Sequence, residues 1–206
     1  MQEERNVDGM KRISLLITVF ALLALVGCSK PPEAEMQAAN AAIEHARGAE
    51  AEMYVPDSWQ MVQDTLNAAM AAKKEQDEKF ALFRSYTDTK NMFVRAEALA
   101  KDVATQAEAE KERVKNEVMT LLTTAQTSLT AAAEALSKAP RGKGNKADLD
   151  LIKSDLDGVT AMLADANNDF NAGKYLSART KAQQVVDRSN AITQEIANAA
   201  AKKAGK

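Results

Sequence analysis

The sequence predicts an all-α protein built from elongated, coiled-coil-like helical bundles. Its 206 residues are rich in alanine and in long unbranched side chains, whereas aromatic residues make up 4% and the chain has 8 glycines and 4 prolines. Such a composition favours helix at nearly every position and leaves few of the β-branched and aromatic runs that strands need. Apolar residues also recur at alternating steps of three and four, which is the spacing of a helix face that packs against another helix.

This spacing marks six amphipathic segments. In the last two segments the apolar face is unbroken, so we expect these two helices to pack antiparallel. Met53 and Leu82 occupy apolar-face positions in earlier segments and are therefore expected in the core. Pro56 separates the first two segments, and Asp57 and Gln60 are spaced as a capping box that opens the second. The six segments cover residues 36–53, 59–69, 82–107, 118–136, 149–170 and 175–199.

One long helix is expected to join two halves of the chain. Neither glycine nor proline occurs between Asp57 and Ala139, and pairs of opposite charge three residues apart, such as Glu110 and Arg113, support an exposed helix. We therefore predict a single helix over residues 78–138 whose two ends belong to different bundles. The chain then divides into two three-helix units, residues 34–108 and 109–200, in tandem around this shared central helix.

The N-terminus has the features of a secretory signal. Lys11 and Arg12 precede an apolar stretch at residues 13–26, and the small residue Gly27 follows. This stretch is shorter than the roughly 18 residues that a membrane-spanning helix needs. We expect residues 1–27 to be removed, and translation could start at Met1 or at Met10.

The end of this signal contains the single cysteine of the chain. Leu25, Val26, Gly27 and Cys28 resemble the lipobox of bacterial lipoproteins. The resemblance implies cleavage before Cys28, a diacylglycerol on its sulfur and an acylated amine. Two or more acyl chains would anchor the protein stably, because each buried CH₂ contributes about 0.8 kcal/mol. Ser29 follows where Asp would retain such a protein at the inner membrane, which implies the outer membrane. A small buried cysteine in a transmembrane anchor is the alternative.

Charge and residue inventory argue against several function classes. With 27 Lys and Arg against 29 Asp and Glu, the net charge is −2, whereas a nucleic-acid-binding domain would be clearly basic. The one histidine, His45, and the one cysteine cannot assemble a catalytic triad or a metal cluster. We therefore predict no nucleic-acid partner, no metal, no cofactor and no enzyme activity.

The region after the signal also resembles a known class of proteins. Ala41-Ala42-Ile43-Glu44, then Tyr54-Val55-Pro56 opening a helix, then an acidic turn beside the aromatic residues Phe80 and Tyr175, are similar to alanine-rich helical envelope lipoproteins. The mature region of those proteins is a domain of unknown function. The resemblance covers most of residues 36–200, implies a structural or adaptor role in the envelope, and transfers no catalytic residues.

Two further positions are candidate contact sites. Phe80 and Phe83 lie off the apolar stripe of their segment and could form an exposed partner-binding face. Lys206 is the last residue of the basic tail, residues 201–206. The well-known murein lipoprotein, which is joined covalently to peptidoglycan, also ends in lysine. This resemblance implies a peptidoglycan attachment at Lys206.

Together these features predict an outer-membrane-anchored lipoprotein that acts as a non-catalytic helical scaffold or adaptor in the periplasm. A lipidated tether, residues 28–33, would hold it to the membrane, with envelope proteins or peptidoglycan as further partners. Two alternatives stay open: a peptide- or protein-binding carrier or chaperone-like module that uses a groove between helices, and a covalent peptidoglycan anchor. The apolar seams could close within one chain or between copies, so a homo-oligomer also stays open.

Overall fold

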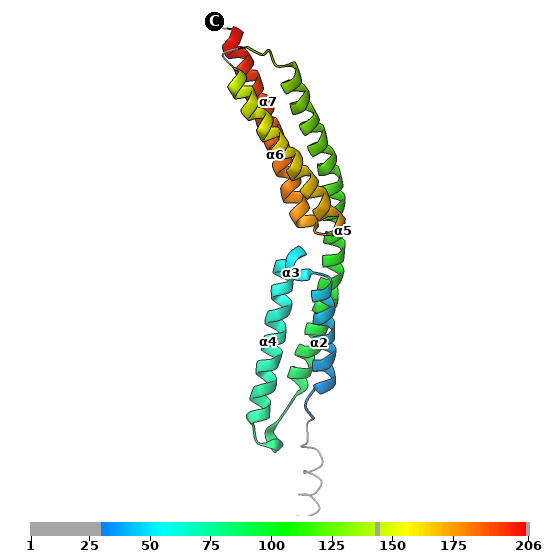
Figure 1. Ribbon diagram of the computed structural model, residues 1–206. Coiled ribbons are helices and arrows are strands. Elements are labelled where there is room, and N and C mark those ends of the chain that lie inside the picture. Colours follow the sequence, from blue (N-terminus) through cyan, green and yellow to red (C-terminus); the bar gives the residue numbers. More distant parts are fainter. Residues whose placement is uncertain (1–29, 143–144, 205–206) are drawn as a thin grey trace, which may run out of the picture. The chain divides into compact units, whose positions relative to one another are not determined.

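The computed structural model describes residues 30–142 and 145–204, with the side chains of residues 202–204 excepted. The described residues form α-helices and one short 3₁₀ helix, and they contain no β-strand, which confirms the all-α fold (Figure 1). Cys28, the lipobox residues Leu25, Val26 and Gly27, and Lys206 lie outside the described residues. The helices are α2 (Glu33–Gly48), α3 (Ala51–Tyr54), α4 (Pro56–Glu78), η1 (Ala81–Phe83), α5 (Thr87–Lys138), α6 (Lys146–Asn171) and α7 (Tyr175–Ala204).

The chain forms two compact units, and the division falls between Glu108 and Ala109. Unit 1 contains α2, α3, α4 and the first part of α5, and unit 2 contains the rest of α5 with α6 and α7. The 52-residue helix α5 passes through this boundary without interruption and contributes residues to the cores of both units. None of the described helices is both long enough and apolar enough to cross a bilayer.

The core of unit 1 is narrow and largely made of alanine. Phe93 on α5 is fully buried and has the largest of the fully buried side chains in the described chain. It packs with Ala39 of α2, Ala69 of α4 and Ala96 of α5, against the partly buried side chains of Met36, Leu66 and Met92. Alanine lets helices approach closely, but it buries little apolar area per residue, so this core stabilises the unit only modestly.

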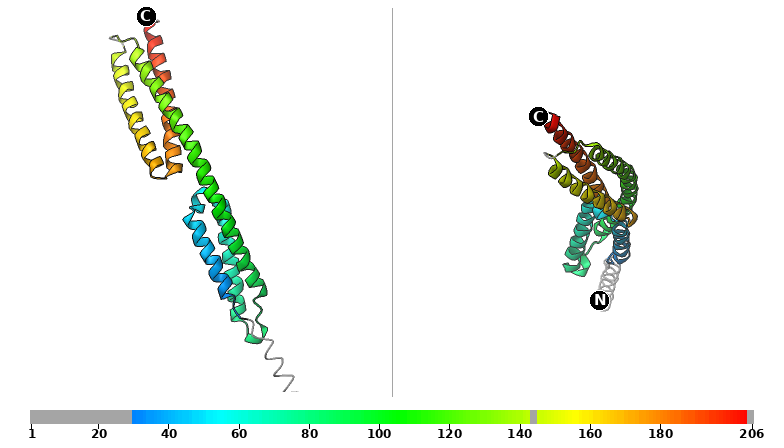
Figure 2. Two further views of the ribbon diagram at one scale, coloured as in Figure 1. Left: turned by 90° about the vertical axis from the view of Figure 1, so that its right-hand side faces the viewer. Right: turned by 45° about the horizontal axis from the view of Figure 1, so that its top comes forward.

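The core of unit 2 is larger and has branched side chains. The two views of Figure 2 show α6 and α7 running side by side, as the spacing of their apolar residues predicts. The turn between them is tight: Gly173 has φ 76°, and the backbone amides of Gly173 and Lys174 donate hydrogen bonds to the carbonyls of Phe170 and Asp169. The buried members from α6 and α7 are Leu149, Ile152, Leu156, Val159, Leu163, Ala166, Ala182, Val185, Ile192 and Ile196.

The predicted continuous helix over residues 78–138 is wrong at its start. Helix α4 ends at Glu78, and α5 begins at Thr87. The segment between them holds the 3₁₀ helix Ala81–Phe83, and Leu82, expected in the core, is 57% exposed. The chain reverses direction here without glycine or proline because side chains from α4 and from the segment itself satisfy its backbone groups.

The end of α2 also departs from the expected pattern. Met53, expected in the core, is 59% exposed, whereas Ala51 and Tyr54 are buried. The cause is a break at Glu50, whose φ of 61° interrupts the helix and moves the buried face to different positions. The predicted capping box of Asp57 and Gln60 is absent as well: α4 begins at Pro56 with no side-chain cap, and Gln60 donates a hydrogen bond of 2.9 Å to Asp64 instead.

Two glycines of unit 2 provide a matched test of helix and turn geometry. Gly158 lies within α6, and a methyl group added there would meet no atom within 4 Å. We expect Gly158→Ala to raise the free energy of unfolding by about 1 kcal/mol, because alanine loses less conformational entropy in a helix. Gly173→Ala also has open space around it, but we expect it to lower that free energy by about 1 kcal/mol because of the positive φ. Urea unfolding followed by circular dichroism measures both, and shifts of the same sign would contradict the described geometry.

A buried serine provides a second test. Ser189 on α7 is fully buried within the described chain, and its Oγ has no hydrogen-bond partner there. We expect Ser189→Ala to raise the free energy of unfolding by about 1 kcal/mol, since it removes an unsatisfied hydroxyl from the core. Ser177→Ala is the control, because the Ser177 hydroxyl donates a hydrogen bond of 2.6 Å to Asp169 and its loss should destabilise unit 2. A destabilised Ser189→Ala variant would show that the hydroxyl has a partner.

Candidate functional site

The segment that joins α4 to α5 carries the most exposed aromatic side chains of the described chain. Phe80 is 69% exposed, Leu82 57% and Phe83 75%. We call these three residues the apolar tip. The two phenyl rings lie 6.3 Å apart between centroids, with their planes tilted by 52°, and the Phe83 amide donates a hydrogen bond of 2.8 Å to the Phe80 carbonyl. Because apolar side chains gather here instead of lying singly on the surface, the tip is a candidate contact site.

From the sequence, Phe80 and Phe83 were a possible exposed face, whereas Leu82 was expected in the core. The structure places the two phenylalanines side by side within one turn of 3₁₀ helix. Leu82 joins them because the helix periodicity that assigned it to the core does not continue through the break. A usable signal was present in the sequence: Phe80, Leu82 and Phe83 crowd into four residues, which is denser than a helix face with three-four spacing.

Polar contacts behind the tip hold the segment in place. The Arg84 guanidinium donates hydrogen bonds to the backbone carbonyls of Lys79, at 2.9 Å, and Asp77, at 2.8 Å. The Ser85 amide donates to the Gln76 side chain at 3.1 Å, and the Tyr86 hydroxyl donates to the Asp77 carboxylate. The bonds from Arg84 satisfy carbonyls that the end of α4 would otherwise leave without partners. We call Asp77, Arg84 and Tyr86 the polar base of the tip.

Ion pairs connect the polar base to the first turn of α2. Lys73 lies 3.0 Å from Asp77 and 3.2 Å from Glu33, and a second pair joins Lys90 of α5 to Glu35 at 2.8 Å. The tip therefore lies at the same end of unit 1 as the start of α2, whereas α3 lies at the opposite end (Figure 1). Exposed pairs of this kind contribute little to stability, but they fix which ends of the three helices meet.

The charges in the polar base are stable at neutral pH. The hydrogen bond from Tyr86 and the one from Lys73 hold the pKa of Asp77 below its ordinary value of 3.8. The same bond to Asp77 raises the pKa of Tyr86, and Asp77 with Glu33 raises the pKa of Lys73. Asp77 therefore stays ionised and Tyr86 stays protonated near pH 7, so the base acts as a fixed support for the tip and offers no group that exchanges protons at this pH.

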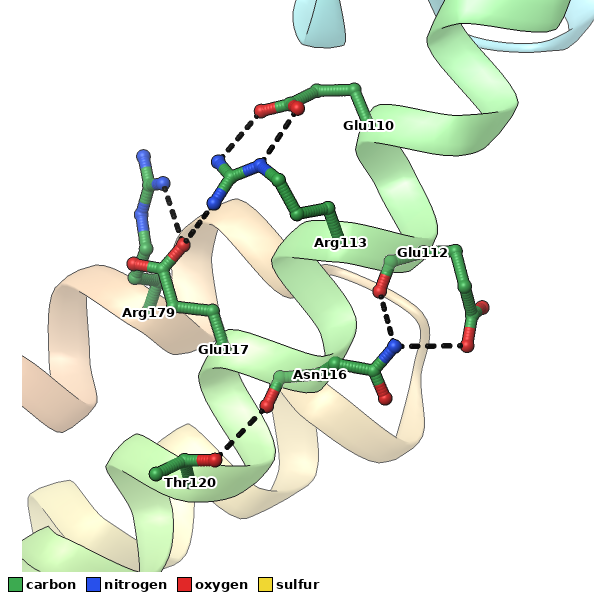
Figure 3. A network of polar contacts seen from close by, with 7 residues as sticks. All are labelled: Glu110, Glu112, Arg113, Asn116, Glu117, Thr120 and Arg179. Atoms are coloured by element: carbon green, nitrogen blue, oxygen red, sulfur yellow. Dashed lines mark hydrogen bonds and ion pairs between the residues drawn. The ribbon is translucent and has the colours of Figure 1, made fainter.

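Unit 2 carries a second polar network, on the surface between α5 and α7 (Figure 3). The Arg113 guanidinium donates to both carboxylate oxygens of Glu110, at 2.7 and 2.8 Å, and to Glu117 at 3.1 Å. Arg179 of α7 lies 3.7 Å from the same Glu117 oxygen. The Glu110 partner raises the pKa of Arg113, and Arg113 lowers the pKa of Glu110. The network joins the two helices at the surface and is solvent-exposed.

Next to this network an open groove of about 760 Å³ runs between α5 and α7. Carbon atoms of threonine, glutamine and other polar residue types form much of its wall, and Leu121 is the one large apolar side chain among its lining residues. This lining offers few hydrophobic anchors for a peptide, because peptide grooves are usually lined by apolar and aromatic side chains. The lining residues are Glu117, Thr120, Leu121, Thr124, Arg179, Thr180, Gln183 and Gln184.

Within residues 30–142 and 145–201, histidine, cysteine, aspartate and glutamate side chains form no group of three or more that could hold a metal ion. His45 lies exposed on α2. The positions expected for lipid and peptidoglycan attachment, Cys28 and Lys206, lie outside the described residues. No protein-family model, no curated protein sequence and no solved structure matches this chain.

The polar base can be tested by removing the Asp77 charge. We expect Asp77→Asn to speed amide hydrogen exchange at Phe83 and Ser85 several-fold, because the variant weakens the bonds from Tyr86 and Lys73. Asp64→Asn on the same helix is the control, since the hydrogen bond that Asp64 accepts comes from Gln60, one turn away on α4. Equal exchange rates in the native protein and Asp77→Asn would show that the base does not hold the segment.

The same variant has a defined pH dependence. The folded-state pKa of Asp77 is lowered, so its contribution to stability is complete above the ordinary value of 3.8 and is lost as the pH falls through the folded-state pKa. The difference in urea midpoint between the native protein and Asp77→Asn should therefore be constant near neutral pH and disappear in acid. A difference that grows as the pH falls would contradict this assignment.

Proposed function

We propose that this protein is an outer-membrane lipoprotein, anchored through acyl chains on Cys28, which serves as a non-catalytic helical scaffold or adaptor in the periplasm. The observation that carries the proposal is the resemblance of Leu25, Val26, Gly27 and Cys28 to a lipobox at the end of a secretory signal. Cleavage there would leave residues 28–206 as the mature chain, and every described helix belongs to it.

The described part of the chain supports a tethered role. Helix α2 begins at Glu33, five positions after Cys28 and with four residues between the two. Two of them, Pro31 and Pro32, restrict the backbone. A fully extended segment of this length reaches about 18 Å at 3.6 Å per residue. Acyl chains on Cys28 would therefore hold unit 1 close to the leaflet.

The surfaces of both units fit a scaffold better than a carrier. The groove between α5 and α7 is open and has one large apolar lining residue, so it supplies few of the buried contacts that hold a peptide. The core of unit 1 is packed from alanine and Phe93, with Met36, Leu66 and Met92 against them. The apolar tip, in contrast, presents three side chains outward on a rigid support. Because the tip lies at the end of unit 1 where α2 begins, near the proposed anchor, we expect it to contact another surface in the envelope.

Acylation tests the anchor directly. In the native host, radiolabelled palmitate should enter the protein, and Cys28→Ser should abolish the label and leave the signal uncleaved or the protein unattached, because the sulfur carries the diacylglycerol. Ser29→Ala, next to the acylated residue, is the control and should label normally. A labelled Cys28→Ser protein would contradict acylation at this sulfur, and an unlabelled native protein would remove the anchor altogether.

Two further measurements separate the alternatives. Density-gradient fractionation should place the labelled protein with the outer membrane, and recovery with the inner membrane would correct that part of the proposal. Muramidase digestion followed by mass spectrometry of the C-terminal peptide would reveal a muropeptide on Lys206 if the chain is also joined to peptidoglycan. A free C-terminal peptide would leave the lipid as the attachment.

A further inference from the structure

The apolar tip is exposed, is held to α4 by hydrogen bonds and lies at the same end of unit 1 as the start of α2 (Figure 1). Phe80, Leu82 and Phe83 point away from unit 1, as their exposed fractions of 69%, 57% and 75% show. The polar base holds them through the bonds of Arg84 to the carbonyls of Asp77 and Lys79. An occupant of this surface therefore meets an ordered apolar loop, and binding does not have to order the loop first.

The size of the tip argues against a second copy or a protein as its main occupant. A stable protein interface buries at least about 1,000 Å² in total, and even a completely buried aromatic side chain contributes only about 150–250 Å². About half of that total, roughly 500 Å², lies on each partner, and three side chains that are exposed by 57–75% supply less than this on their own. A lipid surface does not need a large complementary patch, because each apolar side chain that enters it contributes separately.

The location of the tip favours a lipid surface in particular. Lys73 joins the base of the tip to Glu33, in the first turn of α2, and Cys28 precedes Glu33 by five residues. Acyl chains on Cys28 would therefore keep the tip within a short tether length of the leaflet. At such a high effective concentration, even weak insertion is favourable.

The residues around the tip fit the boundary between lipid tails and headgroups. Lys79 and Arg84 flank the apolar residues on both sides and can remain at headgroup level while the tip enters the tails. Acidic residues lie beside them: Lys79 is 3.0 Å from Glu75, and the charge of Arg84 helps to lower the pKa of the Asp77 carboxylate. Because the local charge is mixed, the attraction depends on the apolar side chains and only weakly on anionic lipid.

We propose that Phe80, Leu82 and Phe83 insert into the leaflet that holds the acyl chains on Cys28 and so form a second membrane contact. This inference rests on the proposed lipid anchor. With the acyl chains and the apolar tip both in the leaflet, unit 1 cannot rotate freely about the anchor, and the two contacts fix its orientation to the membrane. The tip would thus convert a flexible lipid attachment into a fixed base for the scaffold.

A fluorescent probe beside the tip tests this. Ala81 is exposed in the same 3₁₀ helix, so Ala81→Cys accepts an environment-sensitive dye without removing any tip residue, while the acylated Cys28 does not react. The acylated protein is reconstituted into vesicles of phosphatidylethanolamine and phosphatidylglycerol. We expect a blue-shifted dye that nitroxide-labelled lipids quench. The same dye at Met53→Cys, on α3 and 59% exposed in the native chain, should report water.

A substitution series separates insertion from mere proximity. In the Ala81→Cys background, replacing both phenylalanines, Phe80→Ser with Phe83→Ser, should return the dye to its aqueous emission, with an unchanged melting temperature because both rings are exposed. Met61→Ser with Met70→Ser removes two exposed apolar side chains of α4 (56% and 44% exposed) and should leave the dye inserted. Added salt and vesicles without phosphatidylglycerol should change the result little.

Vesicle flotation distinguishes failure of the tip from failure of the anchor. If the protein floats with the vesicles but the Ala81 and Met53 dyes both report water, the tip inference is wrong and the anchor stands. If the protein carries no acyl chains and does not float, both proposals fail. If the Ala81 dye shifts to the blue without vesicles as the protein concentration rises, a second copy covers the tip and insertion is contradicted.

Discussion

The structure depends on the burial of narrow, alanine-rich helix faces, which are shielded from water only when the helices pack against one another. In unit 1 alanine allows close approach of α2, α4 and α5, and Phe93 is the largest side chain that is completely buried between them. In unit 2 leucine, isoleucine and valine of α6 meet the facing residues of α7. Because α5 supplies one face to each core, the integrity of this helix is required for both units.

Packing of the alanine-rich helix faces also explains why residues 79–86 can form a turn that carries large apolar side chains. Packing of α2, α4 and α5 brings the end of α4 and the start of α5 together, and the segment between them must reverse without glycine or proline. Arg84, Asp77 and Tyr86 meet the hydrogen-bonding needs of that reversal. With its polar groups satisfied from behind, the segment leaves Phe80, Leu82 and Phe83 facing outward. The same contacts that close the turn therefore create the candidate contact surface.

The sequence predicted regular helix faces well and irregular joints poorly. Ile152, Val159 and Val185 are buried as their spacing predicts, because a continuous helix carries its periodicity from one turn to the next. Met53 and Leu82 were assigned to the core wrongly because the helix periodicity was extended through breaks at Glu50 and at residues 79–86. Residues 79–86 contain neither glycine nor proline, so the usual helix-breaking residues did not mark that break, and the crowding of Phe80, Leu82 and Phe83 was the one local signal. The sequence offered Phe80 and Phe83 as a possible exposed face because they lie off the apolar stripe, but it could not indicate the geometry of the segment that holds them.

The sequence by itself determined the helical class and the faces that are buried in α6 and α7, because both depend on residues close together along the chain. Only the tertiary structure decided where the long helix starts, which apolar residues gather at the tip and that the tip lies beside the first turn of α2. The physical reason is that Lys73, Asp77 and Arg84 act on partners from other turns and other helices. Contacts of that kind form only when the alanine-rich faces pack and bring those partners together.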